Sequence, residues 1–138
     1  MTAFSWAIVT VCIWGVVPII EKHALTNTAP LVGVFFRSMG VVIGLIFFGL
    51  FAIRPGDLKS VDIKTVLLLM LAGVLASLVA QITFYNALKL GEVSRITPLC
   101  GTYYLITFVL GVFLLGESIT VPKVCGVLLI AGGAWLLR

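Results

Sequence analysis

The residues best suited to chemistry are polar side chains set inside long apolar runs. Gln81, Tyr85 and Asn86 lie within the apolar run 66–88, and Arg37 lies within the run 31–53. Polar and ionisable groups inside a membrane-spanning segment are costly, and they usually face the protein interior and mark a pathway. These residues are therefore predicted to line a route for a solute.

Glu21 and Arg37 are candidates for an ion pair. Glu21 lies six residues before Asn27, which is taken as the membrane edge, and Arg37 lies ten residues after it. Their depths then differ by about 6 Å at about 1.5 Å per helical residue, a gap that two long side chains can close. Two alternatives stay open: Lys22 or Arg37 could meet an anionic substrate, or Glu21 could carry a coupling proton. No carboxylate occurs at mid-span, which argues against proton coupling.

The predicted polar lining is larger than this pair. It comprises Trp14, Lys22, Arg37, Gln81, Tyr85, Asn86 and Tyr103. All of these except Trp14 fall in the half of the helix bundle next to the first and third loops. The other half of the bundle consists almost entirely of aliphatic residues and phenylalanine. A single copy is therefore expected to form a polar vestibule that opens to one side of the membrane.

Composition identifies the elements that must position these groups. The 138 residues are 62% hydrophobic and 10% charged, whereas a soluble domain carries about 25% charged residues. Since about 20 apolar residues span a bilayer, we expect an all-α, multi-pass membrane protein with five helices in one bundle. The whole chain, residues 1–138, is one domain with spans at about 4–25, 30–53, 65–88, 95–116 and 121–137. The loops are too short to hold a folded domain, and Arg54-Pro55-Gly56-Asp57 predicts a turn.

Several other functions are excluded or disfavoured. The net charge is +4, but the nine lysines and arginines occur without a basic cluster, so nucleic-acid binding is not expected. Cys12, Cys100 and Cys125 have no metal-ligand spacing and read as apolar packing residues. His23 is the single histidine, and no nucleophile–base spacing or cofactor motif is present. No enzyme, metal or cofactor is predicted, and no cleavable signal peptide is expected.

The charge balance gives the chain no preferred orientation. The two sides of the predicted topology carry equal numbers of basic residues: Arg54, Lys59, Lys64 and Lys123 on one, and Lys22, Lys89, Arg95 and Arg138 on the other. More Lys and Arg on the cytoplasmic side normally decides orientation. The balance is either chance in a small sample, or it predicts dual topology, with an antiparallel homodimer that resembles an inverted repeat.

Small residues, a proline and a glutamate are given structural roles. Gly40 and Gly44 have the GxxxG spacing of close helix packing. Gly126, Gly132 and Gly133 are expected to act in the same way in the last helix, within the chain or between copies. Pro98 is either a hinge or a tolerated first-turn proline. Glu117 is expected to satisfy backbone N–H groups at the start of the last helix, which Thr120 caps with Pro122 in its first turn.

Together these features resemble the EamA family of the drug/metabolite transporter superfamily. The resemblance covers essentially the whole chain. It is carried, in order, by Trp14-Gly15, Lys22, Arg37, Tyr85-Asn86-Ala87-Leu88, Pro98, Leu115-Gly116-Glu117, Ile119-Thr120 and the segment from Gly126 to Gly132. The resemblance implies a secondary carrier that exports or exchanges small organic metabolites. Family members usually carry two inverted five-helix repeats, so one repeat implies that a second copy supplies the other half.

The family is also related to the small multidrug resistance transporters, which are four-helix antiparallel dimers with a glutamate inside the first helix. The middle of the first helix here, Val11-Cys12-Ile13-Trp14-Gly15, has no carboxylate. This difference argues against a proton/cation antiport of that kind.

The leading hypothesis is a transporter of the plasma (inner) membrane that moves a small organic metabolite or drug-like solute by alternating access. It would act as a dual-topology homodimer. Two alternatives stay open: a flippase for a lipid-linked carrier, and a non-transporting subunit of a membrane protein complex.

Overall fold

The fold is helical throughout the part of the chain that the structure describes. The computed structural model describes residues 2–54, 56, 58 and 61–137, and no strand occurs among them. Four helical segments are long and apolar enough to cross a membrane: Ala3–Asn27, Pro30–Ala52, Ile63–Leu90 and Val93–Leu115. A fifth, Val121–Leu136, is apolar but shorter. The predicted all-α membrane fold is therefore confirmed.

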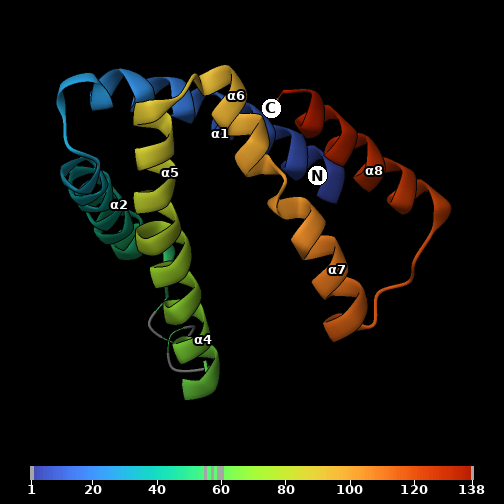
Figure 1. The fold of residues 1–138 in the computed structure, drawn as a ribbon. Coiled ribbons are helices and arrows are strands. Elements are labelled where there is room, and N and C mark those ends of the chain that lie inside the picture. The colour runs from blue at the N-terminus through green and yellow to red at the C-terminus, as the bar shows by residue number, and fades with distance from the viewer. Residues whose placement is uncertain (1, 55, 57, 59–60, 138) are drawn as a thin grey trace. The chain divides into compact units, whose positions relative to one another are not determined.

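The chain divides into two compact units. The first comprises residues 1–89 and the second residues 90–138. Figure 1 draws the helices of the first unit from blue to yellow-green and those of the second from yellow to red. Each unit is described by itself below.

The first unit begins with two spans joined by a tight connection. Helix α1 (Ala3–Ala24) starts at Thr2, whose hydroxyl accepts a hydrogen bond from the N–H of Ser5. A 3₁₀ turn, η1 (Leu25–Asn27), follows, and α2 (Pro30–Ala52) begins with a proline at its first position. Proline suits the start of a helix because its missing N–H would have no helical partner there. The short connection therefore holds the end of α1 beside the start of α2.

The third span contains a change of helix type. Asp62 caps α4 (Ile63–Val74), which continues as a π-helical segment, η2 (Leu75–Val79), and then as α5 (Ala80–Leu90). Residues spaced by four drift round an α-helix, because one turn takes about 3.6 residues. A wider π turn reduces that drift. The four-residue repeat of Gly73, Ser77, Gln81 and Tyr85 is thus better accommodated with the π turn than in an unbroken α-helix.

The packed core of the first unit lies at one end of its helices. Its buried apolar residues are Leu25, Val34, Tyr85 and Leu88. They come from η1, the first turns of α2 and the last turns of α5. The candidate site described below lies within this group of residues.

The second unit contains a broken span and the shorter helix. The sequence predicted one helix over 95–116, but the structure divides it at Thr102 into α6 (Val93–Gly101) and α7 (Tyr103–Leu115). Pro98 lies inside α6 rather than in its first turn. The Thr102 N–H and hydroxyl both donate to the carbonyl of Leu99, at 3.1 and 2.6 Å. These contacts replace the regular ladder at Thr102, while Val93–Leu115 as a whole remains long and apolar enough to cross a membrane.

The connection to the last helix, α8 (Val121–Leu136), is stabilised differently from the prediction. Gly116 ends α7 with a φ of 68°, a conformation that glycine adopts without steric cost. Thr120 precedes α8 but its side chain makes no capping hydrogen bond, and Pro122 lies in the first turn as predicted. The Glu117 carboxylate lies 3.5 Å from Lys123 Nζ. Glu117 thus ties the connection to α8 through an ion pair.

Some predictions fall on residues that the structure does not describe. The turn predicted at Arg54-Pro55-Gly56-Asp57 includes two such residues, Pro55 and Asp57. Lys59 and Arg138, which enter the charge balance, also lie outside the described residues.

Candidate functional site

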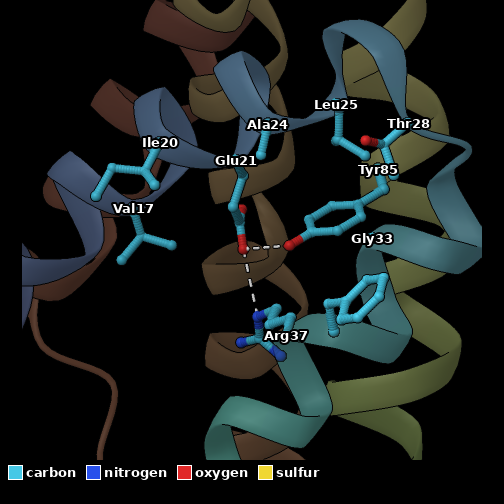
Figure 2. Close-up of a pocket in the computed structure, with 10 residues that line it drawn as sticks. Val17, Ile20, Glu21, Ala24, Leu25, Thr28, Gly33, Arg37 and Tyr85 are labelled. Atoms are coloured by element: carbon cyan, nitrogen blue, oxygen red, sulfur yellow. Dashed lines mark hydrogen bonds and ion pairs between the residues drawn. The ribbon is translucent and has the colours of Figure 1, made fainter.

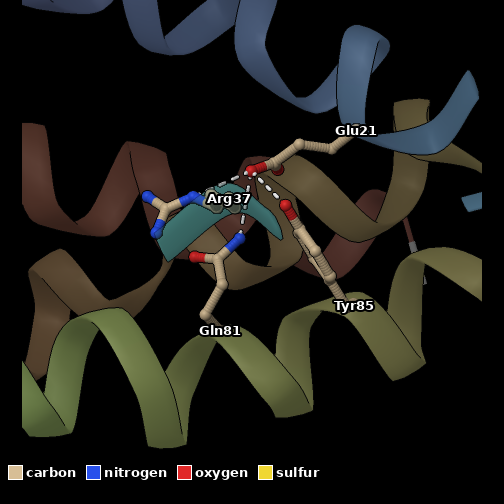
Figure 3. Close-up of polar contacts among 4 residues, drawn as sticks. All are labelled: Glu21, Arg37, Gln81 and Tyr85. Atoms are coloured by element: carbon tan, nitrogen blue, oxygen red, sulfur yellow. Dashed lines mark hydrogen bonds and ion pairs between the residues drawn. The ribbon is translucent and has the colours of Figure 1, made fainter. Parts of the chain in front are cut away.

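One carboxylate oxygen joins three helices of the first unit. Glu21, near the end of α1, accepts hydrogen bonds at Oε1 from Tyr85 Oη at 2.9 Å and from Gln81 Nε2 at 3.1 Å. Arg37 of α2 approaches the same oxygen through Nε at 3.3 Å. Figure 3 shows the three side chains converging on Glu21. We call these four residues, Glu21, Arg37, Gln81 and Tyr85, the Glu21 cluster.

The four residues explain how a charge can lie in this apolar chain. Only 9% of the Glu21 side chain is exposed, and Arg37 is exposed to 34%. An isolated buried carboxylate is strongly disfavoured, whereas one that is paired and hydrogen-bonded is tolerated. The guanidinium supplies the opposite charge, and the phenol and amide satisfy the oxygen further.

Helical spacing places the donors. Gln81 and Tyr85 are four residues apart on α5, directly after the π turn, so they lie on one face of that helix. Gly33 and Arg37 have the same spacing on α2. A Cβ atom at Gly33 would lie 3.1 Å from Tyr85 Cε2 and 2.9 Å from Leu25 Cδ2. Glycine at this position therefore allows the tyrosine ring to pass α2 and reach Glu21.

Two lysines bind the neighbouring backbone. Lys22 donates from Nζ to the carbonyl of Leu88 near the end of α5. Lys89 donates from Nζ to the carbonyl of Thr28, in the connection before α2, at 2.9 Å. Cations are favoured at the C-terminal ends of helices, where carbonyl groups lack helical partners. Together the two contacts tie α5 to α1 and to the connection that follows it.

A cavity of about 390 Å³ lies beside the Glu21 cluster. Its lining combines the cluster's Glu21, Arg37 and Tyr85 with mostly apolar neighbours, namely Val17, Ile20, Ala24, Leu25, Thr28, Gly33 and Phe36. Figure 2 shows Glu21, Arg37 and Tyr85 meeting within this lining. Ligand sites of about 300–1,000 Å³ with apolar walls and a few polar groups are typical for small molecules.

Comparison with known proteins places the chain in a family. Residues 1–138 match the model of the EamA-like transporter family. The chain belongs to this family. It is also 34% identical over 84 residues to a Sinorhizobium sp protein named "Uncharacterized transporter in cobO 3'region". That match covers 61% of this chain and 57% of the relative, so the chain spans only a little over half of the relative. No solved structure gives a significant match.

The other predicted lining residues of this EamA-like chain lie outside the Glu21 cluster. Trp14 is 59% exposed on α1. Asn86 is exposed, and its Nδ2 donates to the carbonyl of Ile82 one turn earlier in its own helix, at 2.8 Å. Tyr103 belongs to the second unit, where its ring centroid is 4.2 Å from that of Tyr104. The structure thus brings together Arg37, Gln81 and Tyr85 of the predicted lining, with Glu21 as their common partner.

The predicted packing glycines of the EamA-like chain have open space where a side chain would begin, as far as the described residues show. A Cβ atom added at any of them would meet no neighbouring atom within 4 Å among the described residues; these are Gly40, Gly44, Gly126, Gly132 and Gly133. Their role in packing between copies stays a prediction.

Two contributors to the site were not identified as such from the sequence. Gly33 is not among the predicted site residues, and its spacing of four from Arg37 is the signal that sets it apart from Gly40 and Gly44. Lys89 continues the four-residue repeat of Gln81 and Tyr85 but is not among the predicted lining residues. Among the described residues, no group of His, Cys, Asp or Glu could hold a metal ion.

Proposed function

We propose that this chain is part of a secondary transporter that moves a small organic solute by alternating access. The observation that carries the proposal is the Glu21 cluster, a charged and hydrogen-bonded group inside apolar spans, beside a cavity of about 390 Å³. Ionisable residues in spans typically mark substrate pathways. Membership of the EamA-like transporter family and a relative named as a transporter support the same conclusion.

The mechanism that we propose uses the cluster as part of the solute site and the lysine contacts as part of a gate. Glu21 joins α1, α2 and α5, so a solute that contacts Arg37 or Tyr85 acts on all three helices. Opening this end of the unit requires release of the Lys22–Leu88 and Lys89–Thr28 contacts. A rocking of helices around a fixed site is the common form of alternating access.

The assembly that we propose is an antiparallel homodimer in the plasma (inner) membrane. The equal numbers of basic residues on the two sides, four and four, support insertion in both orientations. Two inverted copies would present the vestibule to each side in turn. Reporter fusions at the C-terminus test this arrangement, and we expect signal from both sides of the membrane. Signal from one side only would contradict dual topology.

Transport itself is tested by solute exchange in vesicles that contain the purified protein. A panel of labelled cationic, zwitterionic and anionic metabolites would be compared for the unaltered protein and for Arg37→Ala, Gln81→Ala and Tyr85→Ala. We expect exchange of at least one class, and slower exchange for each variant. Arg54→Lys, at an exposed arginine after the end of α2, is the control, because it leaves the balance of basic residues unchanged. If the purified chain by itself exchanges no solute, and an added partner chain restores exchange, the result would support the role of a non-transporting subunit.

A further inference from the structure

The charges around the cavity are unequally accessible. The Glu21 side chain is 9% exposed and the Arg37 side chain 34%. The three side chains that contact Glu21, from Arg37, Gln81 and Tyr85, all meet at Oε1. A solute can therefore reach the Arg37 guanidinium more easily than the Glu21 carboxylate.

The contact between Arg37 and Glu21 leaves part of the guanidinium available. Arg37 approaches Glu21 through Nε at 3.3 Å, and Figures 2 and 3 show its two terminal nitrogens directed away from the carboxylate. No hydrogen bond links Nη1 or Nη2 to another residue in the described part of the chain. A guanidinium carries five N–H donors in a planar fork, which matches a carboxylate through two parallel hydrogen bonds.

The surrounding charges favour an anion as well. Lys22 follows Glu21 directly and binds the Leu88 carbonyl, and Lys89 binds the carbonyl of Thr28, a residue that lines the cavity. Among the described residues of the first unit, Arg37, Lys22 and Lys89 thus bring three positive charges to this end, and Glu21 brings one negative charge. A site with an excess of one sign of charge raises the local concentration of the opposite ion.

The rest of the cavity is apolar. Val17, Ile20 and Phe36 line it beside Arg37, and such walls favour the burial of hydrocarbon groups. We propose that the cavity binds solutes with one carboxylate on an apolar body, the carboxylate seated on Nη1 and Nη2 of Arg37. This inference rests on the proposed function and adds the substrate class to it.

The test is equilibrium binding to the purified full chain in a neutral detergent. The probes are phenylacetate, phenylacetamide, phenethylamine and phenyl phosphate, which share a phenyl group and differ in the attached polar group. Stabilisation against heat at increasing probe concentration gives the dissociation constant, since binding to the native state raises stability by mass action. We expect phenylacetate to bind at least about tenfold more tightly than the amide or the amine, from its charge-assisted pair of hydrogen bonds. Equal or tighter binding of the amide, amine or phosphate, or no binding by any probe, would overturn the proposal.

Substitutions at Arg37 and in the cavity wall test where phenylacetate binds. Arg37→Lys keeps the charge but loses the fork, so it should weaken phenylacetate binding, and Arg37→Gln should remove the preference for the acid. Arg54→Lys, which keeps the balance of basic residues, should leave the preference unchanged. Because Arg37→Gln leaves Glu21 without its cation, Ala24→Leu is a second variant that fills the cavity while leaving the ion pair in place. It should also weaken phenylacetate binding, and a retained preference in both Arg37→Gln and Ala24→Leu would contradict the assignment.

The binding result is separable from transport. Phenylacetate binding through Arg37 in a protein that exchanges no solute would sustain the inference and count against the proposed function. Exchange of cationic solutes without acid-selective binding would sustain transport and overturn the inference.

Discussion

Tyr85 Oη lies 2.9 Å from Glu21 Oε1, so the hydroxyl of a buried tyrosine in α5 donates to the buried carboxylate of α1. The two residues are 64 positions apart in the chain. Their contact joins the first and third spans of the first unit at the point where Arg37 of α2 also arrives. The stability of this end of the unit and its proposed solute site therefore depend on the same atoms.

Tyr85→Phe removes the hydroxyl and keeps the ring. We expect the free energy of unfolding to fall by about 1–2 kcal/mol, because Glu21 loses one donor in an apolar environment. Thermal or denaturant unfolding in detergent measures the change. Tyr104→Phe, in α7, is the control, and it should stay within about 0.5 kcal/mol of the unaltered protein. Equal effects of the two substitutions would contradict the role of the hydroxyl.

Gly33→Ala adds a Cβ atom where the structure has no room for one. Since that atom would lie 2.9 Å from Leu25 Cδ2 and 3.1 Å from Tyr85 Cε2, we expect a loss of about 1–3 kcal/mol of stability. Gly40→Ala on the same helix is the matched control, because its Cβ would meet nothing within 4 Å among the described residues. If the Gly33→Ala and Gly40→Ala variants are equally stable, the result would contradict the close contact between the Tyr85 ring and α2 at Gly33.

Arg37→Gln leaves the Glu21 carboxylate without its cation. We expect a loss of about 2 kcal/mol or more, and partial recovery in the double variant Glu21→Gln/Arg37→Gln, which has no unpaired charge. Arg95→Gln is the control, since Arg95 pairs with Glu92 at 3.5 Å but the two side chains are 65% and 73% exposed. An exposed pair contributes about 0–1 kcal/mol. A double variant less stable than Arg37→Gln alone would argue against the pair.

The start of α4 should respond to acid. Hydrogen bonds from the Thr65 hydroxyl and N–H hold the pKa of the exposed Asp62 carboxyl below its usual value. A group whose pKa is lowered by folding stabilises the fold above its ordinary pKa, and this contribution is lost as the pH falls through the folded value. Unfolding followed between pH 7 and pH 3 should show a smaller loss of stability for Asp62→Ala than for the unaltered protein. Parallel pH profiles would contradict the cap.

Much of the fold and part of the site follow from residue types and spacing. The apolar runs and their charged ends predicted the spans, because a bilayer permits few alternatives to helices. Because Glu21 and Arg37 lie close enough in predicted membrane depth for their side chains to meet, an ion pair was one of the predictions. The structure places Arg37 Nε 3.3 Å from Glu21 Oε1. Spacing by four placed Gln81 and Tyr85 on one face of a helix.

Other contacts depend on local competition that spacing does not reveal. The amide of Asn86 binds the Ile82 carbonyl of its own helix, and the ammonium of Lys22 binds the Leu88 carbonyl. A backbone carbonyl is a strong acceptor with two lone pairs, so a nearby polar side chain can bind it instead of facing a cavity. The break at Thr102 likewise depends on which donor reaches the Leu99 carbonyl. None of these choices is visible in residue types alone.

The most direct test of the central claim, that the Glu21 cluster is a transport site, is solute exchange in vesicles with Arg37→Ala, Gln81→Ala and Tyr85→Ala. Initial rates per folded protein should fall by about tenfold or more for Arg37→Ala, since a charge-assisted contact is lost. Gln81→Ala and Tyr85→Ala should also be slower, and Arg54→Lys should match the unaltered protein. Unchanged rates for all three cluster variants would contradict the account.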